Sequence, residues 1–278
     1  NYSNNKTRIK LFYGFFFPFF LITSKFFLRI DTFIWNAYIN FLQKKYKYNF
    51  IIVSHPLLYR YVEKVNTKII YDCCDDNELF YKKGKLRKLI NFENRRLLKN
   101  SNLNIFSSNN LWEKYKKYNQ KNTIIRNAHL ININNKKKNN IIKNKNQLNI
   151  FYFGTISSWF DSSLIVKILK KFKKVHFTFI GPVDSKKIIH KRVKYIGSME
   201  HKKLMDFSLN ADAFILPFRV NNLIKSVDPV KLYEYLFFNV PVISVYYSEL
   251  IYFKKYINLY KNELEAFQII KKIIKNNK

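Results

Sequence analysis

The sequence predicts an α/β protein built from two Rossmann-like parallel sheets, each covered by helices. Two observations support this fold class. Short apolar, strand-like runs alternate with helical segments along most of the chain, and the connections between them are short. Such alternation is typical of βαβ units, whose strands run parallel. The 278 residues also suffice for two domains of the usual size, roughly 100 to 200 residues each.

The first half of the chain contains one alternating series. We expect helices at 31–46, 57–65, 84–99 and 110–118, and strands at 49–54, 68–73, 103–108 and 122–127. Residues 1–130 are assigned to the first domain on this basis. Residues 131–147 are rich in Asn and Lys without a periodic apolar face, so we interpret them as a linker, with a nucleic-acid-binding tail as the alternative.

The second half contains another series, which we assign to a second domain at 148–250. Its expected strands end at Gly154, Gly181, Gly197 and Phe218 or begin at Pro241, and helices are expected at 162–172, at 199–210 and from Pro229. Glycine at three strand ends is typical of the carboxyl edge of a doubly wound sheet, where the backbone turns tightly or approaches a ligand. Residues 251–278 are expected to form an amphipathic helical segment.

The helix near Pro229 carries the strongest indication of a ligand site. Asp228 can cap this helix, and Pro229 can begin it because a first-turn residue needs no amide hydrogen. The free amides of Val230 and Lys231 and the positive end of the helix dipole favour a phosphate group. Lys231 and Glu234 fall on one face of the helix. A surface ion pair between them is the alternative interpretation.

The chain is strongly basic, with a formal net charge of +33 and a pI near 10.0. Such a charge fits nucleic acid or an anionic membrane surface. However, Lys, Asn, Ile, Tyr and Phe are abundant while Gly and Pro are scarce, as expected from a very AT-rich genome, and we attribute most of the charge to that bias. Neither an RNA-binding signature nor a zinc-ligand spacing is present in the sequence.

Two local features bear on the compartment. The only cysteines, Cys73 and Cys74, are adjacent, so a disulfide framework is not supported and a reducing cytoplasm fits best. The apolar run at 11–23 is shorter than the roughly 20 residues that span a bilayer. We interpret it as a buried core element or as an interfacial segment that contacts anionic lipid at the inner face of the cell membrane.

Several ordered segments resemble the nucleotide-sugar-binding domain of GT-B fold glycosyltransferases, particularly the retaining glycosyltransferase family 4 of bacterial surface-polysaccharide synthesis. They are FYFGTISSWFD at 151–161, FTFIGPV at 177–183, VKYIGSMEHKKLMDFSLNADAFILPF at 193–218 and NNLIKSVDPVKLYEYLFFNVPVIS at 221–244. In the first half, IIYDCCDD at 69–76 and NTIIRNAHL at 122–130 are similar to the acceptor domain. The resemblance implies two domains facing a cleft, the first lacking its usual opening strand and glycine loop.

The resemblance implies a set of donor-binding residues. Glu234 occupies the second position of a carboxylate pair that accepts hydrogen bonds from ribose hydroxyls, and such charge-assisted bonds contribute about 1.5 to 3 kcal/mol. Ser226 occupies the first position, so the sugar contact would come from the Ser226 hydroxyl or from Asp228. The diphosphate would lie over Gly154 and Thr155. The full donor set is Gly154, Thr155, Gly181, Pro182, Gly197, Ser226, Asp228, Pro229, Val230, Lys231 and Glu234.

For the acceptor side, Asp72, Asp75 and Asp76 lie at and just after the end of the expected strand 68–73. Clustered carboxylates raise one another's pKa, so one of them could orient or deprotonate an acceptor hydroxyl. The family often has a histidine near here; we take Asp75 as its substitute, with Asp72 and His55 as further catalytic candidates. A capped loop without chemistry is the alternative for Asp75, and a structural histidine is the alternative for His55.

The resemblance implies a hexosyltransferase that moves a sugar from a nucleoside diphosphate sugar to a glycan or lipid-linked acceptor, with retention. We expect no metal and no cofactor, because alignment of the reactants and the cationic helix start would stabilise the leaving diphosphate. One alternative is a noncatalytic or truncated nucleotide-sugar-binding GT-B protein. The other is a basic protein that binds nucleic acid or a membrane surface.

Overall fold

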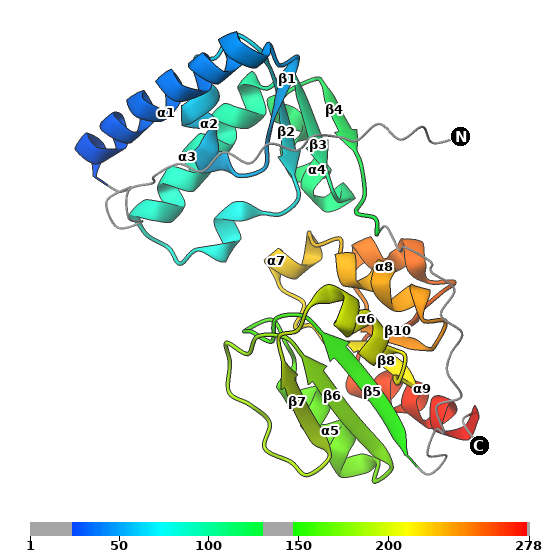
Figure 1. Cartoon of the computed structure of the whole chain (residues 1–278). Helices are drawn as coiled ribbons and strands as arrows, with labels where there is room; N and C mark the ends of the chain where they lie inside the picture. The colour runs from blue at the N-terminus through cyan, green and yellow to red at the C-terminus, as the bar shows by residue number, and fades with distance from the viewer. Residues whose placement is uncertain (1–23, 130–146, 277–278) are drawn as a thin grey trace, which may run out of the picture.

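The computed structural model describes residues 24–129 and 147–276, which form two α/β domains (Figure 1). The first domain, 24–129, has a four-stranded sheet, and the second, 147–276, has a six-stranded sheet. Neighbouring strands are parallel throughout both sheets. The predicted pair of Rossmann-like parallel sheets is therefore confirmed. The apolar run 11–23 and nearly all of the predicted linker lie outside the described residues.

The first sheet follows the order of the chain, β1-β2-β3-β4, as expected when each strand pairs with the next across a helix. Its strands are β1 (Phe50–Val53), β2 (Lys68–Cys73), β3 (Leu103–Phe106) and β4 (Asn122–Ile124). The helices are α1 (Lys25–Tyr46), α2 (Tyr59–Val62), α3 (Lys85–Asn100) and α4 (Asn109–Tyr115), with short 3-10 helices η2 (Pro56–Leu58), η3 (Asn77–Phe80) and η4 (Lys116–Tyr118). Helices α1, α2 and α3 lie side by side (Figure 1).

The second sheet has the order β10-β9-β8-β5-β6-β7, so the direction of strand addition reverses beside β5. Its strands are β5 (Leu148–Phe153), β6 (Val175–Ile180), β7 (Val193–Gly197), β8 (Ala213–Leu216), β9 (Val242–Val245) and β10 (Asn258–Tyr260). The helices are α5 (Ser162–Lys171), α6 (His201–Ser208), α7 (Asn222–Lys225), α8 (Val230–Phe237) and α9 (Glu263–Asn276), with a 3-10 helix η5 (Ser248–Phe253). Doubly wound sheets bind ligands at the carboxyl ends of the strands where such a reversal occurs.

The core of the second domain is dense in aromatic side chains around its central strands. Phe153 of β5 and Phe214 of β8 both pack on Tyr235 of α8, with ring centroids 4.6 and 4.4 Å apart. Tyr235 is fully buried. Burial of large rings contributes most to packing stability, so α8 is held firmly against the middle of the sheet.

Two of the differences between the predicted elements and the structure lie near the ends of the described chain. Helix α1 begins at Lys25, earlier than the expected start at residue 31. The expectation of a helical segment over 251–278 is wrong in part, because β10 precedes α9 and pairs with β9. Helix α9 belongs to the second domain, since Ala266, Ile270 and Ile273 are buried in its core.

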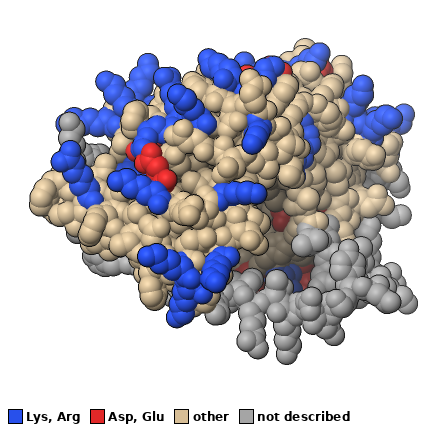
Figure 2. Space-filling model, turned by 90° about the horizontal axis from the view of Figure 1, so that it is seen from above, with Lys and Arg blue, Asp and Glu red and all other residues tan. Residues whose placement is uncertain are grey.

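No helix in the described ranges is long and apolar enough to cross a bilayer. The Lys and Arg side chains are spread over the face seen in Figure 2 instead of forming a single basic patch. A scattered distribution of this kind is typical of a solvated surface.

Candidate functional site

The carboxyl end of β5 lies beside β8, at the point where the strand order reverses. Helix α8 is fixed over this end by Tyr235. Its hydroxyl donates to the carbonyl of Phe153 at 3.3 Å and accepts from the Phe153 amide at 3.1 Å. The side chains in the first turns of α8 are thereby placed at the ligand end of the sheet.

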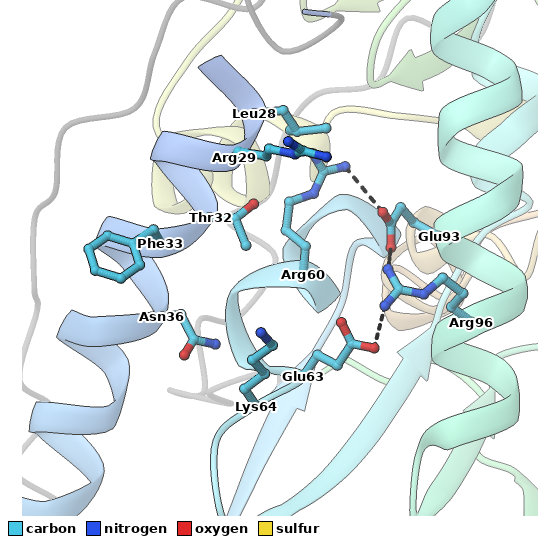
Figure 3. Close-up of a pocket in the computed structure, with 10 residues that line it drawn as sticks. All are labelled: Leu28, Arg29, Thr32, Phe33, Asn36, Arg60, Glu63, Lys64, Glu93 and Arg96. Carbon is cyan, nitrogen blue, oxygen red and sulfur yellow. Dashed lines mark hydrogen bonds and ion pairs between the residues drawn. The ribbon is translucent and has the colours of Figure 1, made fainter. Parts of the chain in front are cut away.

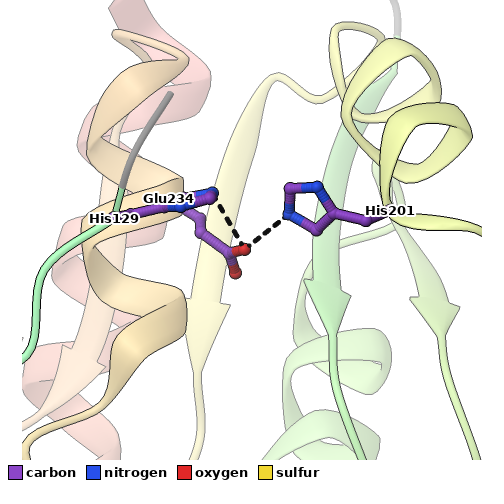
Figure 4. A group of neighbouring side chains, drawn as sticks. All are labelled: His129, His201 and Glu234. Atoms are coloured by element: carbon purple, nitrogen blue, oxygen red, sulfur yellow. Dashed lines mark hydrogen bonds and ion pairs between the residues drawn. The ribbon is translucent and has the colours of Figure 1, made fainter. Parts of the chain in front are cut away.

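Glu234 projects from α8 between two histidines, as Figure 4 shows. Its Oε1 atom lies 2.9 Å from His201 Nε2 and 3.2 Å from His129 Nε2. His201 is the first residue of α6, whereas His129 follows β4 in the first domain. The Glu234 carboxylate therefore lies where the two domains meet, and 13% of its side chain remains exposed.

Lys231 points from the first turn of α8 toward the end of β5. Its Nζ atom lies 3.2 Å from the Tyr152 hydroxyl, and it lies over the rings of Tyr152 and Phe218 at 5.0 and 5.6 Å. Burial disfavours the charged ammonium and lowers the pKa of Lys231 to about 8, although Glu234 acts in the opposite direction. A bound phosphate would favour the protonated form and complete the surroundings of this cation.

Gly154 and Gly181 have backbone φ angles of 128° and 129°, in the region that favours glycine. A methyl group added at Gly154 would collide with the Lys231 ammonium. The amides of both glycines already donate to carbonyls, Gly154 to Ile180 at 2.8 Å and Gly181 to Gly197 at 2.9 Å. These glycines therefore allow close packing of strand ends under Lys231, and their amides already have acceptors within the sheet.

The remaining donor-side candidates line the same strand and helix ends. Gly197 and Pro182 are exposed, and Val230 at the start of α8 is 47% exposed. The Thr155 carbonyl accepts a hydrogen bond from the Tyr152 hydroxyl at 2.9 Å. Val230 and its neighbour in the first turn have amides without an acceptor inside the helix, which is the general property of a helix start.

Asp228 serves the contact between the domains. Its carboxylate accepts from the Asn127 amide at 2.8 Å and from the Tyr233 hydroxyl at 3.0 Å, and it lies 3.6 Å from Arg126. Burial raises the pKa of Asp228 against these favourable contacts. The predicted helix cap is wrong, because the residue at the N-cap of α8 is Pro229, and the Asp228 carboxylate instead accepts from Asn127 of the first domain and from Tyr233 of α8.

Ser226 also belongs to this contact. Its hydroxyl donates to Asn110 Oδ1 at 2.7 Å, and its carbonyl accepts from the Ser108 hydroxyl at 2.8 Å. Ser226 is buried. The structure thus gives Ser226 and Asp228 partners in the first domain, and the sugar contact that the resemblance implied for them stays a prediction.

Glu249 in η5 makes a third contact between the domains. Its buried carboxylate accepts from the backbone amides of Asn109 and Asn110 at 3.2 and 2.8 Å, and from Arg126 at 2.8 Å. The two amides form the start of α4, whose dipole favours a negative charge. Together with Ser226 and Asp228, this residue fixes the position of the first domain beside α8.

On the acceptor side, Asp75 follows β2 and precedes η3, which packs against α7 of the second domain. Burial, assisted by the neighbouring Asp76, raises the pKa of Asp75 to about 6. Asp76 has a structural role, because its carboxylate binds Lys114 at 2.6 Å and Tyr115 at 2.8 Å. Among the described residues, neither Asp75 nor Asp72 has such an ion pair.

The other two acceptor-side candidates, Asp72 and His55, have hydrogen-bond partners within the first domain. Asp72 lies inside β2, where it accepts a hydrogen bond from the Cys74 thiol at 3.3 Å. His55 caps η2, since its Nδ1 atom accepts from the Leu57 amide at 3.3 Å. Burial lowers the pKa of His55. These contacts agree with the structural alternative for His55.

Sequence reasoning missed three residues that complete the site. His129 and His201 are far apart in the chain and follow no ligand spacing, so only the fold brings them to Glu234. Tyr152 is an apolar-pattern residue of a buried strand, yet its hydroxyl meets Lys231. A signal for His201 was available, because it opens the helix after the glycine-ended strand β7.

The group of His129, His201 and Glu234 could also hold a metal ion. Within the part of the chain that the structure describes, their ligand atoms lie within 4.8 Å of one another. Imidazole and carboxylate are ligands that Zn²⁺ takes in proteins. The arrangement therefore suits either a divalent cation or a pair of hydroxyl donors to the carboxylate.

No family model and no curated protein matches the chain. Solved structures do match it. HepE from Anabaena, in complex with UDP and glucose, is 14% identical with a TM-score of 0.64, over 87% of this chain and 72% of that one. Sucrose-phosphate synthase from Thermosynechococcus elongatus is 12% identical with a TM-score of 0.69, over 94% and 72% of the two chains. TarM is 13% identical with a TM-score of 0.66, over 89% and 52%.

At these identities the likeness concerns the fold. The chain has the GT-B fold, in which two Rossmann-like domains face each other. This confirms the fold class that the sequence predicted.

Proposed function

We propose that the chain is a glycosyltransferase that binds a nucleoside diphosphate sugar at the start of α8 and transfers the sugar to a glycan or lipid-linked acceptor. The observation that carries this proposal is the placement of Lys231 and Glu234. Both project from the first turns of α8, over the carboxyl end of β5 and beside the first domain. HepE, which shares the fold, was solved with UDP and glucose.

Each donor contact follows from the chemistry of these groups. The Glu234 carboxylate accepts hydrogen bonds from ribose hydroxyls, which take the place of its contacts with His129 and His201. The Lys231 ammonium and the first-turn amides of α8 bind the diphosphate, where the helix dipole adds to the positive potential. Burial strengthens the electrostatic part of this interaction because the local dielectric is low.

Transfer itself requires alignment of donor and acceptor and stabilisation of the departing diphosphate. Lys231 and the start of α8 supply the stabilisation, so the reaction needs no resident metal ion. Asp75, on the first domain, orients the acceptor hydroxyl and receives its proton. Following the resemblance to glycosyltransferase family 4, we propose a hexosyl transfer with retention, in the synthesis of a surface polysaccharide.

We place the protein in the cytoplasm, at the inner face of the membrane where lipid-linked acceptors are presented. The support is an exposed apolar stripe on α1. Phe26, Phe33 and Phe41 are 67%, 75% and 57% exposed, and they recur at helical spacing. Exposed aromatic side chains beside basic residues favour peripheral contact with anionic lipid.

The substitution Glu234→Gln tests the donor site, because it keeps the shape and removes the charge. Melting shifts with UDP-, GDP- and dTDP-sugars identify the donor first. We then expect kcat/KM for that donor to fall roughly 10- to 100-fold in the variant, which corresponds to about 1.5 to 3 kcal/mol of charge-assisted hydrogen bonding.

Glu113→Gln is the matched control. Glu113 pairs with Lys116 on the surface of α4 and its side chain is 59% exposed, so its loss should leave transfer unchanged. Undiminished transfer by Glu234→Gln would refute the site assignment. A wild-type chain that binds a nucleotide sugar but never turns it over would support a noncatalytic GT-B binding protein instead.

A further inference from the structure

A cavity lies in the first domain, between α1, α2 and α3 (Figure 3). Its volume is about 510 Å³, within the range of roughly 300 to 1,000 Å³ typical of small-molecule sites. Its lining residues are Leu28, Arg29, Thr32, Phe33, Asn36, Arg60, Glu63, Lys64, Glu93 and Arg96. None of them belongs to α8 or to the strand ends at Lys231, so this cavity is separate from the proposed donor site.

Arg60 is the unusual residue of this cavity. It is buried, with 4% of its side chain exposed, yet within the described chain Nε, Nη1 and Nη2 have no hydrogen-bond partner. The nearest carboxylate oxygen, on Glu93, is 3.8 Å away, which is too long for a hydrogen bond. A buried guanidinium without acceptors is costly, so such a group is expected to meet a ligand or water.

The charges around Arg60 leave an excess of cations. Arg96 already binds both carboxylates of the cavity: it pairs with Glu63, and it donates to Glu93 at 2.9 Å. Arg29 and Lys64 line the cavity as well, and Figure 3 shows the side chain of Arg29 extending toward the guanidinium of Arg60. Cationic groups gathered at one end of a cavity repel one another unless an anion lies between them.

We propose that this cavity binds the phosphate group of a small phosphorylated molecule or headgroup. The planar guanidinium of Arg60 presents parallel N–H donors that match phosphate oxygens, and Arg29 supplies a second fork. Thr32 and the carboxylates of Glu63 and Glu93 offer acceptors for the hydroxyl groups of such a ligand, and Leu28 and Phe33 form its apolar wall. The proposal does not depend on the function of the donor site.

The phosphate could arrive on a soluble molecule or on a lipid. Phe33 both lines the cavity and lies in the exposed stripe of α1, so a headgroup could enter from a membrane surface. A soluble ligand and a lipid headgroup would present the same phosphate chemistry to the cavity. We therefore use sn-glycerol 3-phosphate as the probe for both. This compound is the soluble counterpart of the phosphatidic acid headgroup.

Calorimetric titration of the full chain with sn-glycerol 3-phosphate tests the proposal. We expect saturable binding that weakens at least 10-fold in Arg60→Met and in Arg29→Met. Lys88→Met is the matched control, since it removes an exposed cation from α3 outside the cavity. It should bind as the wild type does, and Glu234→Gln should as well.

We expect both variants to fold. In Arg60→Met, Glu93 stays paired with Arg96. Arg29 is exposed, so Arg29→Met leaves the core unchanged. Cosedimentation with phosphatidylcholine vesicles, with and without phosphatidic acid, distinguishes a lipid headgroup from a soluble ligand. If the ligand is a lipid headgroup, the chain binds only the vesicles that contain phosphatidic acid, and this binding depends on Arg29. The proposal is overturned if neither probe binds, or if Arg29→Met and Arg60→Met bind both probes as the wild type does.

Discussion

The Glu234 carboxylate illustrates how much of the site depends on single atoms. One of its oxygens meets two imidazole nitrogens that come from different domains, at 2.9 and 3.2 Å. Of the two, only the contact with His201 is a hydrogen bond, and His129 Nε2 has no hydrogen-bond partner in the described chain. In the proposed donor complex, two ribose hydroxyls would replace one hydrogen bond and one ion-pair contact. Both histidines lie against the carboxylate oxygen that the proposed function assigns to the ribose.

Lys231 gives the donor site a dependence on alkaline pH. Its pKa is lowered to about 8, so the ammonium loses its proton as the pH rises through that value. In the proposed function this ammonium binds the diphosphate. We expect kcat/KM for the donor to fall above pH 8 and expect Lys231→Met to be poorly active at every pH. Because burial disfavours the charge only in the folded state, stability should rise between about pH 8 and the unfolded value near 10.4.

A pH profile of kcat/KM from 7 to 10, with melting temperatures at the same points, checks this prediction. Loss of activity without loss of stability is the expected result. A flat profile through pH 9, or a loss that follows unfolding, would contradict the role of Lys231.

Asp75 is expected to determine how transfer falls at acidic pH. Burial and Asp76 raise its pKa to about 6, so transfer should fall as the pH drops below 6 and the carboxylate becomes protonated. Stability depends on pH in the opposite direction to transfer. Asp75 stabilises the fold at low pH, and this contribution is lost as the pH rises through about 6. We expect Asp75→Asn to transfer poorly and to lose this acid limb. If transfer by the variant still falls below pH 6, that loss comes from the titration of another group.

At the scale of elements, α8 and the end of β5 act as one unit. Tyr235 joins them through the backbone of Phe153, and the absence of a side chain at Gly154 leaves room for Lys231. The strand end therefore determines where the ammonium lies. This explains why glycine is needed at a position whose amide is already used by the sheet.

Gly154→Ala should damage both stability and donor binding. The added methyl group meets the Lys231 ammonium, and a φ of 128° is strained for alanine, which costs roughly 1 to 3 kcal/mol. Chemical denaturation and donor titration measure the two effects. Gly84→Ala is the control, because a methyl group there has no heavy atom within 4 Å. Equal donor affinity in Gly154→Ala and the wild type would show that Lys231 does not depend on this space.

The sequence predicted the longer elements because their apolar patterns are local. The expected strand 68–73 coincides with β2, and the expected helix 84–99 differs from α3 by a single residue at each end. Helix α7 and strand β10 were not predicted, since elements of four and three residues carry too little periodicity. Their positions are determined by tertiary contacts, such as the pairing of β10 with β9.

The same limit explains the site. The helix pattern placed Lys231 and Glu234 on one face, and the resemblance implied the role of Glu234. The position of His129 and His201 beside it required the relative placement of two domains. Ser226 and Asp228 lie in the segment that the sequence predicts as the donor site, and they bind Asn110 and Asn127 of the other domain. Local sequence could not reveal contacts between residues more than 100 positions apart.

For the whole molecule, the two domains of the GT-B fold are joined by buried polar contacts near α8. Glu249 binds the start of α4, and Asp228 binds the backbone after β4. These contacts keep His129 beside Glu234. A donor that enters this junction must therefore change the surroundings of residues from both domains.

Histidine signals in a proton NMR titration with UDP test the central claim most directly. The chain has five histidines: His55, His129, His176, His190 and His201. The account predicts that UDP shifts the ring signals of His129 and His201, assigned with His129→Gln and His201→Gln, and leaves those of His176 and His190 in place. Saturation by UDP with the His129 and His201 signals unmoved would contradict a nucleotide site at Glu234.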